Sequence, residues 1–437
     1  MTTLKNFSQI KPFTIALFAV LCSGTGEGKE VLLLSTDEAI RLAFLNNHDL
    51  QVTEPRVKEA ESRLLLSGKL ANPEVEVSAK GDSLGNDENE GNFEIAVRQS
   101  FPLSSRLRRE RELRKRQVTT AEAELARHRW KLAAKVERTV IGLAAANQRT
   151  KGQRAIMGVN AEIVSFLREQ VKRGEASSLD LAQAELTGRA MEQKAAEFAT
   201  KEKSKTLALK QLLGMEAGED LSIARKLGIP EEEPKKRIPL EKIVLRRSDH
   251  ALARARIDEA DAALNLEKSN RFPDVKVNFF VERERSSYSS AGLDRNTLAG
   301  LGFSIPIPFR QRNADDMEQA RFDRIEAEAT SEALRFRVRN EYAEAFRARL
   351  DAWRLAKEAS GEILQLAEKN VADFQAAYRQ GQTSLLQTQR VQEQLLELKN
   401  AALEAIVNYH LAKARLREVV GDYPKMEPIL KQVSPRK

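Results

Sequence analysis

NPEVEV at residues 72–77 returns as FPDVKV at residues 272–277, which is 200 positions further along the chain. Three more pairs of segments follow in the same order, at offsets of 204 to 207 residues: 100–103 (SFPL) with 304–307 (SIPI), 173–179 (RGEASSL) with 380–385 (QGQTSL), and 212–214 (LLG) with 419–421 (VVG). Landmarks that keep both their order and their spacing indicate an internal repeat.

Each repeat has the same predicted order: a helix, two strands joined by a polar loop, a very long helix, a break at glycine, and a second long helix. We therefore divide the chain into a signal peptide, 1–28, and two repeats, 29–230 and 231–437, joined by the linker 230–239 (PEEEPKKRIP). The first helix of each repeat is expected near 37–70 and 239–270. The other predicted elements are strands near 74–80, 92–101, 274–282 and 297–306, and long helices over 105–171, 177–213, 311–378 and 384–420.

The strands alternate apolar and polar residues, as strands with two different faces do. A soluble sheet with one wet face would show the same pattern. Strands of about nine residues with this alternation also suit a barrel with lipid outside and water inside. Four strands are too few to close a water-filled pore, so several chains would have to share one barrel. The polar residues expected in its lumen are Glu76, Glu94, Arg98 and Lys276.

The long helices contain no proline between about 105 and 171 or between about 311 and 378, and are dense in Ala, Glu, Arg and Leu. At 1.5 Å per residue each spans on the order of 100 Å, and such a helix must pack along its length against partners. The helix 384–420 carries apolar residues at steps of three and four, which is a coiled-coil pattern. A free cytoplasmic coiled coil is the alternative interpretation, but it gives the strands no role.

The net charge is +8, from 72 Lys+Arg and 64 Asp+Glu. The two signs are interleaved except in the basic segment 106–116 (RLRRERELRKR). A charge run on a helix is most often a solvated face, so we do not expect nucleic acid as a partner.

The N-terminus has the layout of a secretory signal: Lys5 and Lys11, a short apolar run over 12–21, and then small residues. The alternative is a buried strand that opens a cytoplasmic domain. Residues 23–30 (SGTGEGKE) resemble a phosphate-binding loop, but Ser23 and Glu30 replace the required Gly and Ser/Thr, and we reject a nucleotide site. The single cysteine, Cys22, excludes a disulfide framework. It is a candidate lipidation site, although the preceding leucine departs from the small residue that such signals carry; otherwise it is an ordinary residue of a removed peptide.

The repeat, the four strands, the paired long helices and the breaks at glycine together resemble the TolC-type outer-membrane efflux proteins. The segments 98–103 (RQSFPL) and 302–309 (GFSIPIPF) are similar to the strand-to-helix junctions of that family, the second especially to those of its Czc-type branch, which serves heavy-metal exporters. The resemblance implies an α+β membrane protein of the bacterial outer membrane. In it, a homotrimer forms a twelve-stranded β-barrel, with four strands per chain, continued by a long periplasmic α-helical barrel.

The resemblance also implies function and partners: the passive outer-membrane channel of a tripartite efflux pump, working with a periplasmic adaptor (membrane fusion protein) and an inner-membrane pump, and exporting substrates such as heavy-metal cations. The helix breaks match the tip motif that contacts the adaptor. The docking candidates are Arg173, Gly174, Ser178, Leu179, Gly381, Thr383, Ser384 and Leu385. Well-studied members have aspartates after the second glycine, around the closed pore, where this chain has Gln387 and Arg390. An acidic gate is therefore in doubt, and we predict instead that Arg390 pairs with an acidic residue such as Asp180.

No catalytic, cofactor-binding or metal-binding residue is predicted. The four histidines (His48, His128, His250 and His410) are scattered, without the spacing of a zinc site. Two alternatives to a channel stay open at this point: a cytoplasmic or periplasmic coiled-coil scaffold, and the periplasmic adaptor itself. An adaptor would have one helical hairpin between β modules, whereas this chain has two hairpins and four short strands.

Overall fold

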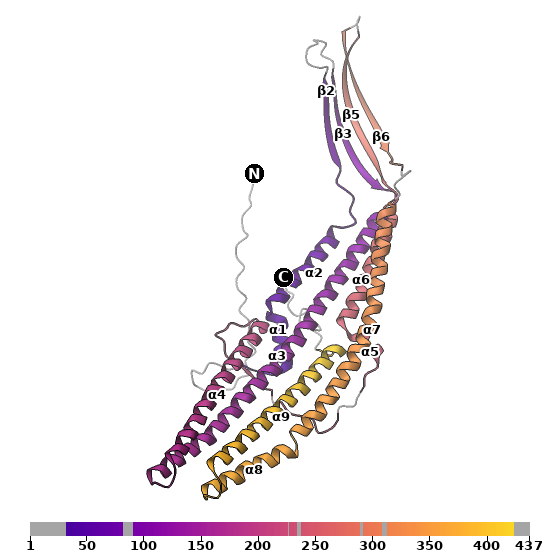
Figure 1. Ribbon diagram of the computed structural model, residues 1–437. Helices are drawn as coiled ribbons and strands as arrows, with labels where there is room; N and C mark the ends of the chain where they lie inside the picture. Colours follow the sequence, from indigo (N-terminus) through magenta and orange to yellow (C-terminus); the bar gives the residue numbers. More distant parts are fainter. Residues whose placement is uncertain are drawn as a thin grey trace, which may run out of the picture.

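The computed structural model describes residues 32–81, 91–225, 227–233, 237–288, 292–307 and 313–423. The predicted signal peptide, 1–28, and Cys22 lie outside the described residues. The molecule is elongated, with a four-stranded sheet at one end and two helical hairpins at the other (Figure 1).

The first repeat contains α1 (Thr36–Asn46), α2 (His48–Leu66), β2 (Glu74–Gly81), β3 (Gly91–Pro102), α3 (Arg106–Lys172) and α4 (Ser178–Leu213). The second contains α5 (Leu240–Arg246), α6 (Ser248–Ser269), β5 (Asp274–Tyr288), β6 (Gly292–Ser304), α7 (Ala314–Ala359), α8 (Glu362–Arg379) and α9 (Leu385–Val420). A short parallel pair, β1 (Leu32–Leu34) with β4 (Leu221–Ile223), lies within the first repeat and was not predicted. Among the described residues, no helix combines the length and the apolarity that a membrane span needs.

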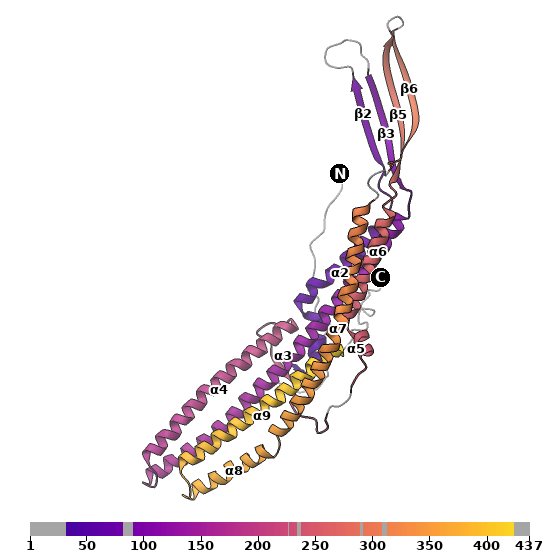
Figure 2. The same cartoon turned by 45° about the vertical axis from the view of Figure 1, so that its right-hand side comes forward.

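The four long strands form one antiparallel sheet in the order β2-β3-β5-β6. The helices directly below the sheet pack in the matching order α2, α3, α6, α7. Figure 1 shows this order, and in the turned view of Figure 2 α7 comes to the front. Further down, α4 packs on α3, and α9 packs on α3, α7 and α8. The chain therefore has two open sides, one formed by β2 and α2 and the other by β6 and α7.

The two repeats use equivalent contacts where α4 and α9 end. Asn47, between α1 and α2, donates its side-chain amide to the carbonyl of Leu212 at 2.9 Å. Arg247, between α5 and α6, donates its guanidinium to the carbonyl of Val419 at 3.1 Å. Both pairs of positions differ by the repeat offset. These contacts lie beside the two larger hydrophobic clusters, one built by α1, α3 and α4 around Ile40 and the other by α5, α7 and α9.

The structure corrects three element boundaries. The helix expected over 311–378 is two helices, because Gly361 has φ −85° and ψ −141°, outside the helical region. The leading helix of each repeat is interrupted, at Asn47 and at Arg247, which are both in extended backbone with ψ of 121° and 131°. The strand β5 is longer than predicted, since its pairing with β6 continues through Arg285 to Tyr288.

Candidate functional site

The first helical hairpin turns at Gly174, which has φ +75°. This left-handed conformation disfavours a residue with a Cβ. The N–H of Gly174 donates to the carbonyl of Val171 at 3.0 Å, and the N–H of Glu175 donates to the carbonyl of Gln170 at 2.9 Å. Together these bonds are a Schellman motif, which satisfies the last carbonyls of α3.

The second hairpin repeats this geometry at Gly381, which has φ +72°. Its N–H donates to the carbonyl of Tyr378 at 3.0 Å, and that of Gln382 donates to the carbonyl of Ala377 at 2.9 Å. The tips of the two hairpins are therefore the same structural motif, used twice in one chain.

A serine begins the return helix at each tip. Ser177 caps α4 by accepting from the N–H of Leu179 at 3.1 Å, and Ser384 caps α9 by accepting from the N–H of Gln387 at 3.3 Å. Ser177 is thus the counterpart of Ser384. The two serines are 207 positions apart, which is the repeat offset at the tips.

Most of the predicted docking residues lie on the surface of the tips: Arg173, Gly174, Ser178, Leu179, Gly381 and Ser384 are exposed, and Thr383 is half-buried. Leu385 is the exception, because it is 5% exposed and packs with Leu167 and Ala184 between the hairpins. The exposed leucine of the second tip is Leu386, which the sequence analysis missed and which is equivalent to Leu179.

The two hairpins contact each other just above the tips. The rings of Phe166 and Tyr378 meet edge to face at 6.3 Å between centroids. The guanidinium of Arg379 lies 3.8 Å from the carboxylate of Glu162, in a pair that is well exposed on both sides. Burial, and then the nearby charge of Asp180, raises the pKa of the Tyr378 hydroxyl. These contacts hold the hairpins together within one chain.

Of the three predicted gate residues, Asp180 and Gln387 lie in the first turn of α4 and of α9, and Arg390 lies in the second turn of α9. All three are exposed. The hydroxyl of Thr383 donates to the side-chain oxygen of Gln387 at 2.7 Å. Among the described residues, no ion pair joins Arg390 to Asp180 or to another carboxylate. The predicted latch is therefore not formed within a single chain. The repeat counterpart of Arg390 is the neutral Gln183.

A band of buried amides and hydroxyls along the two helical hairpins was not predicted. Gln153 donates to the carbonyl of Met191 and Asn160 to that of Ala184, both at 3.3 Å. The buried members of the band are Gln153, Asn160, Thr388, Gln389 and Gln392. These positions were not predicted because only apolar residues were counted as packing positions of the coiled coil. An amide residue at the same spacing of three and four would have identified them.

The register of the sheet assigns the four predicted lumen residues to one face. Glu76, Glu94 and Arg98 share this face because their directly paired residues also lie on it. Lys276 pairs with Ser100 on the same face, and Arg98 forms an ion pair with Glu76. Glu282, which was not predicted, lies directly opposite Glu94 and accepts a hydrogen bond from Asn92.

The opposite face of the sheet is apolar and uncovered. Val75 is 68% exposed and Phe303 is 71% exposed, and other apolar side chains of that face are exposed as well. Apolar surface of this extent marks an interface with a protein or with lipid. The sheet is thus polar on one side and apolar on the other, and no layer built from the described residues covers either side.

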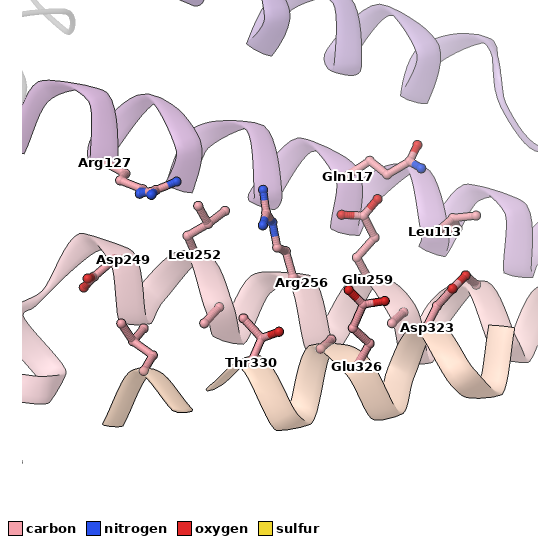
Figure 3. Close-up of a pocket in the computed structure, with 15 residues that line it drawn as sticks. Leu113, Gln117, Arg127, Asp249, Leu252, Arg256, Glu259, Asp323, Glu326 and Thr330 are labelled. Carbon is pink, nitrogen blue, oxygen red and sulfur yellow. The ribbon is translucent and has the colours of Figure 1, made fainter. Parts of the chain in front are cut away.

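A groove lies on α6 between α3 and α7, with a volume of about 540 Å³ (Figure 3). Its polar wall mixes signs, with Arg256 and Glu259 on α6 and Asp323 and Glu326 on α7. Arg256 is neutralised by Glu124 at 2.8 Å. In the part of the chain that the structure describes, no group of three or more His, Cys, Asp or Glu is arranged to hold a metal ion.

A sequence profile of the outer membrane efflux protein family matches both repeats, over residues 39–215 and 240–422. The chain belongs to the outer membrane efflux protein family. The cobalt-zinc-cadmium resistance protein CzcC of Cupriavidus metallidurans is similar to it, with 23% identity over 313 residues that cover 69% of this chain and 71% of that protein.

Solved structures of family members share the fold. CusC matches with a TM-score of 0.71 and 18% identity, covering 92% of this chain and 95% of its own. The Campylobacter jejuni CmeC outer membrane channel matches with a TM-score of 0.70 and 17% identity, covering 91% and 88%. CusC forms a transmembrane channel, and CmeC is an outer membrane channel.

Family membership makes this chain a component of an outer-membrane efflux channel that extends into the periplasm, and not an enzyme. The coiled-coil scaffold and the periplasmic adaptor do not fit this family. The similarity to CzcC supports the predicted Czc-type branch.

Proposed function

We propose that three copies of this chain close one channel, in which the sheets form a twelve-stranded β-barrel through the outer membrane and the long helices continue it into the periplasm. The observation that carries this proposal is the sheet itself. It has a charged face, an uncovered apolar face and two edge strands, β2 and β6, each paired on one side only. Joining the β6 edge of one copy to the β2 edge of the next removes every open edge and separates water from lipid.

The two open helical sides support the same head-to-tail closure. On α7, Phe322 and Phe336 are exposed on a common face, by 63% and 66%. On α2, at the other open side, Val52, Leu65 and Leu66 are exposed. In a heterologous interface, one patch on a chain contacts a different patch on the next chain. In a closed ring, the α7 patch of each copy would therefore cover the α2 patch of its neighbour, and neither patch would remain in water.

The tips are the proposed docking site for a periplasmic adaptor. The two equivalent turns present Leu179 and Leu386 beside exposed polar groups, including Arg173 and Ser384. Three copies would give six such turns around one axis, each with the same glycine cap. We propose that they receive the helical hairpins of the adaptor, which links the channel to an inner-membrane pump.

The proposed cargo is a divalent heavy-metal cation, by similarity to CzcC. In this proposal the channel does not coordinate its cargo, because passage is passive and the pump selects the ion. Arg390 acts at the closed tip, where three copies of a cationic side chain near one axis would oppose cations unless carboxylates of neighbouring chains pair with them.

Single-channel conductance of the purified protein in planar bilayers tests the function. We expect discrete cation-conducting openings, and a higher conductance for Arg390→Glu. Unchanged conductance in that variant would remove Arg390 from the gate. A purified protein that never inserts into bilayers would contradict the channel itself.

A further inference from the structure

The start of α3 is strongly basic, which is the reverse of what a helix favours. A helix N-terminus carries partial positive charge and is stabilised by acidic residues. The first turn of α7 follows this rule, with Asp315 and Asp316, whereas the first turn of α3 contains no acidic residue and several arginines. The basic residues of α3 therefore do not serve the stability of the helix itself.

These basic residues divide into a paired and an unpaired set. Arg106 pairs with Asp274 at 2.7 Å, and Arg116 pairs with Glu112 at 3.0 Å. Within the described residues, four others form neither an ion pair nor a side-chain hydrogen bond: Arg108, Arg109, Arg111 and Lys115. Arg108, Arg111 and Lys115 are exposed, and we call these three the basic face; Arg109 is half-buried and lies on another side of the helix.

The basic face lies on the apolar side of the molecule. At 100° per residue, Arg108, Arg111 and Lys115 fall within about 60° of one another, and Arg106 is roughly opposite them. Arg106 pairs with Asp274, which continues the polar face of the sheet because it shares a face with Lys276. The basic face therefore lies below the opposite, apolar face.

An apolar belt separates the strands from the basic face. Three side chains at the junction between sheet and helices are largely exposed: Leu103 by 62%, Phe272 by 61% and Ile307 by 69%. The basic face follows within about 15 Å along α3. In a membrane, the apolar face of the sheet would contact the acyl chains and the apolar belt would lie at their boundary. Long cationic side chains, such as those of the basic face, would then reach the lipid headgroups.

We propose that the basic face binds the phosphate groups of anionic phospholipids in the periplasmic leaflet of the membrane that the sheet crosses. The inference rests on the proposed function, since it needs the apolar face of the sheet to face lipid. Arg108 and Arg109 line a recess of about 370 Å³ with Arg116 and the acidic Glu112, Asp258 and Asp261. Because Arg116 is neutralised there, Arg108 is the group of the basic face that receives a phosphate at this recess. Such binding fixes the depth of the channel in the membrane.

Native mass spectrometry of the full-length protein in detergent tests the proposal, with titrations of phosphatidylglycerol and, separately, of phosphatidylethanolamine. We expect the wild type to prefer phosphatidylglycerol, and high salt to weaken that preference. Each basic residue near a membrane surface contributes roughly fivefold in affinity, so R108Q/R111Q/K115Q should bind phosphatidylglycerol on the order of 100-fold more weakly. The matched control K151Q/R154Q/K194Q removes three exposed charges from the lower helices and should bind as the wild type does.

Several outcomes overturn the inference: no lipid preference in the wild type, an equal loss in both triple variants, or displacement of the lipid by inorganic phosphate at similar concentration. If the triple variant does not fold, K115Q alone should show the fivefold loss, and R108K/R111K should keep the wild-type affinity. Conductance separates this inference from the proposed function. A wild type that conducts but has no lipid preference contradicts only the inference, whereas a wild type that never conducts contradicts the channel.

Discussion

The two repeats solve one packing problem in two ways. In each, a residue between two short helices donates a hydrogen bond to a carbonyl in the last turn of the return helix. The first repeat uses the neutral Asn47, which is 3% exposed and also caps α2. The second uses Arg247, which is equally buried and is held by Asp249 at 2.6 Å and Glu341 at 3.0 Å.

Arg247 contacts more distant parts of the fold than Asn47 does. The guanidinium of Arg247 stacks over Trp130 of the first repeat at 5.0 Å, and its carboxylate partners lie on α6 and α7. Burial alone would lower the pKa of Arg247, but its hydrogen bonds and ion pairs with Asp249 and Glu341 outweigh burial and raise it. The same position is thus a local cap in one repeat and, in the other, a link between repeats.

The largest expected effect comes from removing that link. Arg247→Ala leaves Asp249 and Glu341 without their cation and should destabilise the fold by about 3 to 4 kcal/mol. Asn47→Ala loses two hydrogen bonds and should cost about 1 to 2 kcal/mol. Thermal unfolding in detergent, followed by far-ultraviolet circular dichroism, measures both. Equal losses in the two variants would show that the charge adds nothing to the neutral contact.

The next largest effect on stability is expected from replacing the glycines that end the return helices. Gly214 and Gly421 both have positive φ, of 66° and 73°. A Cβ on Gly214 would overlap the carbonyl of Asn46, whereas one on Gly421 would lie 3.2 Å from the carbonyl of Arg246. We expect Gly214→Ala to cost about 3 kcal/mol and Gly421→Ala about 1 kcal/mol, the latter from its backbone conformation alone. The same unfolding assay would contradict this comparison if Gly421→Ala were the more damaging change.

The last comparison is a dependence of stability on pH that is carried by the second repeat. Burial, and then the charge of Arg225, lowers the pKa of His410 from 6.5 to about 4. His410 is neutral in the folded state and, in one tautomer, donates to the carbonyl of Gly228 at 2.8 Å. Below pH 6.5 the unfolded chain binds a proton that the folded chain does not, so stability is lost as pH falls toward about 4, by about 2 to 3 kcal/mol.

The counterpart of His410 in the first repeat is the exposed Lys203, which provides a matched control. Unfolding temperatures measured across this pH range should fall less steeply for His410→Gln than for the wild type. Lys203→Gln should leave the slope unchanged. A slope that His410→Gln does not alter would assign the pH dependence to other groups.

Much of the fold could be predicted because the elements of each repeat show characteristic patterns within short segments of the sequence. The alternation around Val75 and Val277 marks the strands, and the glycines at 174 and 381 mark the turns. The matching segments also predicted that both halves share one order of elements. The polar face of the sheet followed directly from the alternation, because residues two apart share a face.

What could not be predicted depends on contacts between distant segments. The interruption at Arg247 has no local breaker; its extended backbone accompanies a hydrogen bond to Val419, 172 positions away. The burial of Leu385 depends on Leu167 in the other hairpin. Gly361 could have indicated the break between α7 and α8. One continuous helix was predicted instead, because the residues on both sides of Gly361 favour helix.

The mass of the particle that conducts tests the central claim most directly, because one chain offers too few strands to enclose water. Native mass spectrometry of the detergent-solubilised protein, on the same preparation that gives single-channel openings, should find three chains per conducting particle. A conducting monomer, or a stable monomer that never enters a bilayer, would contradict the account.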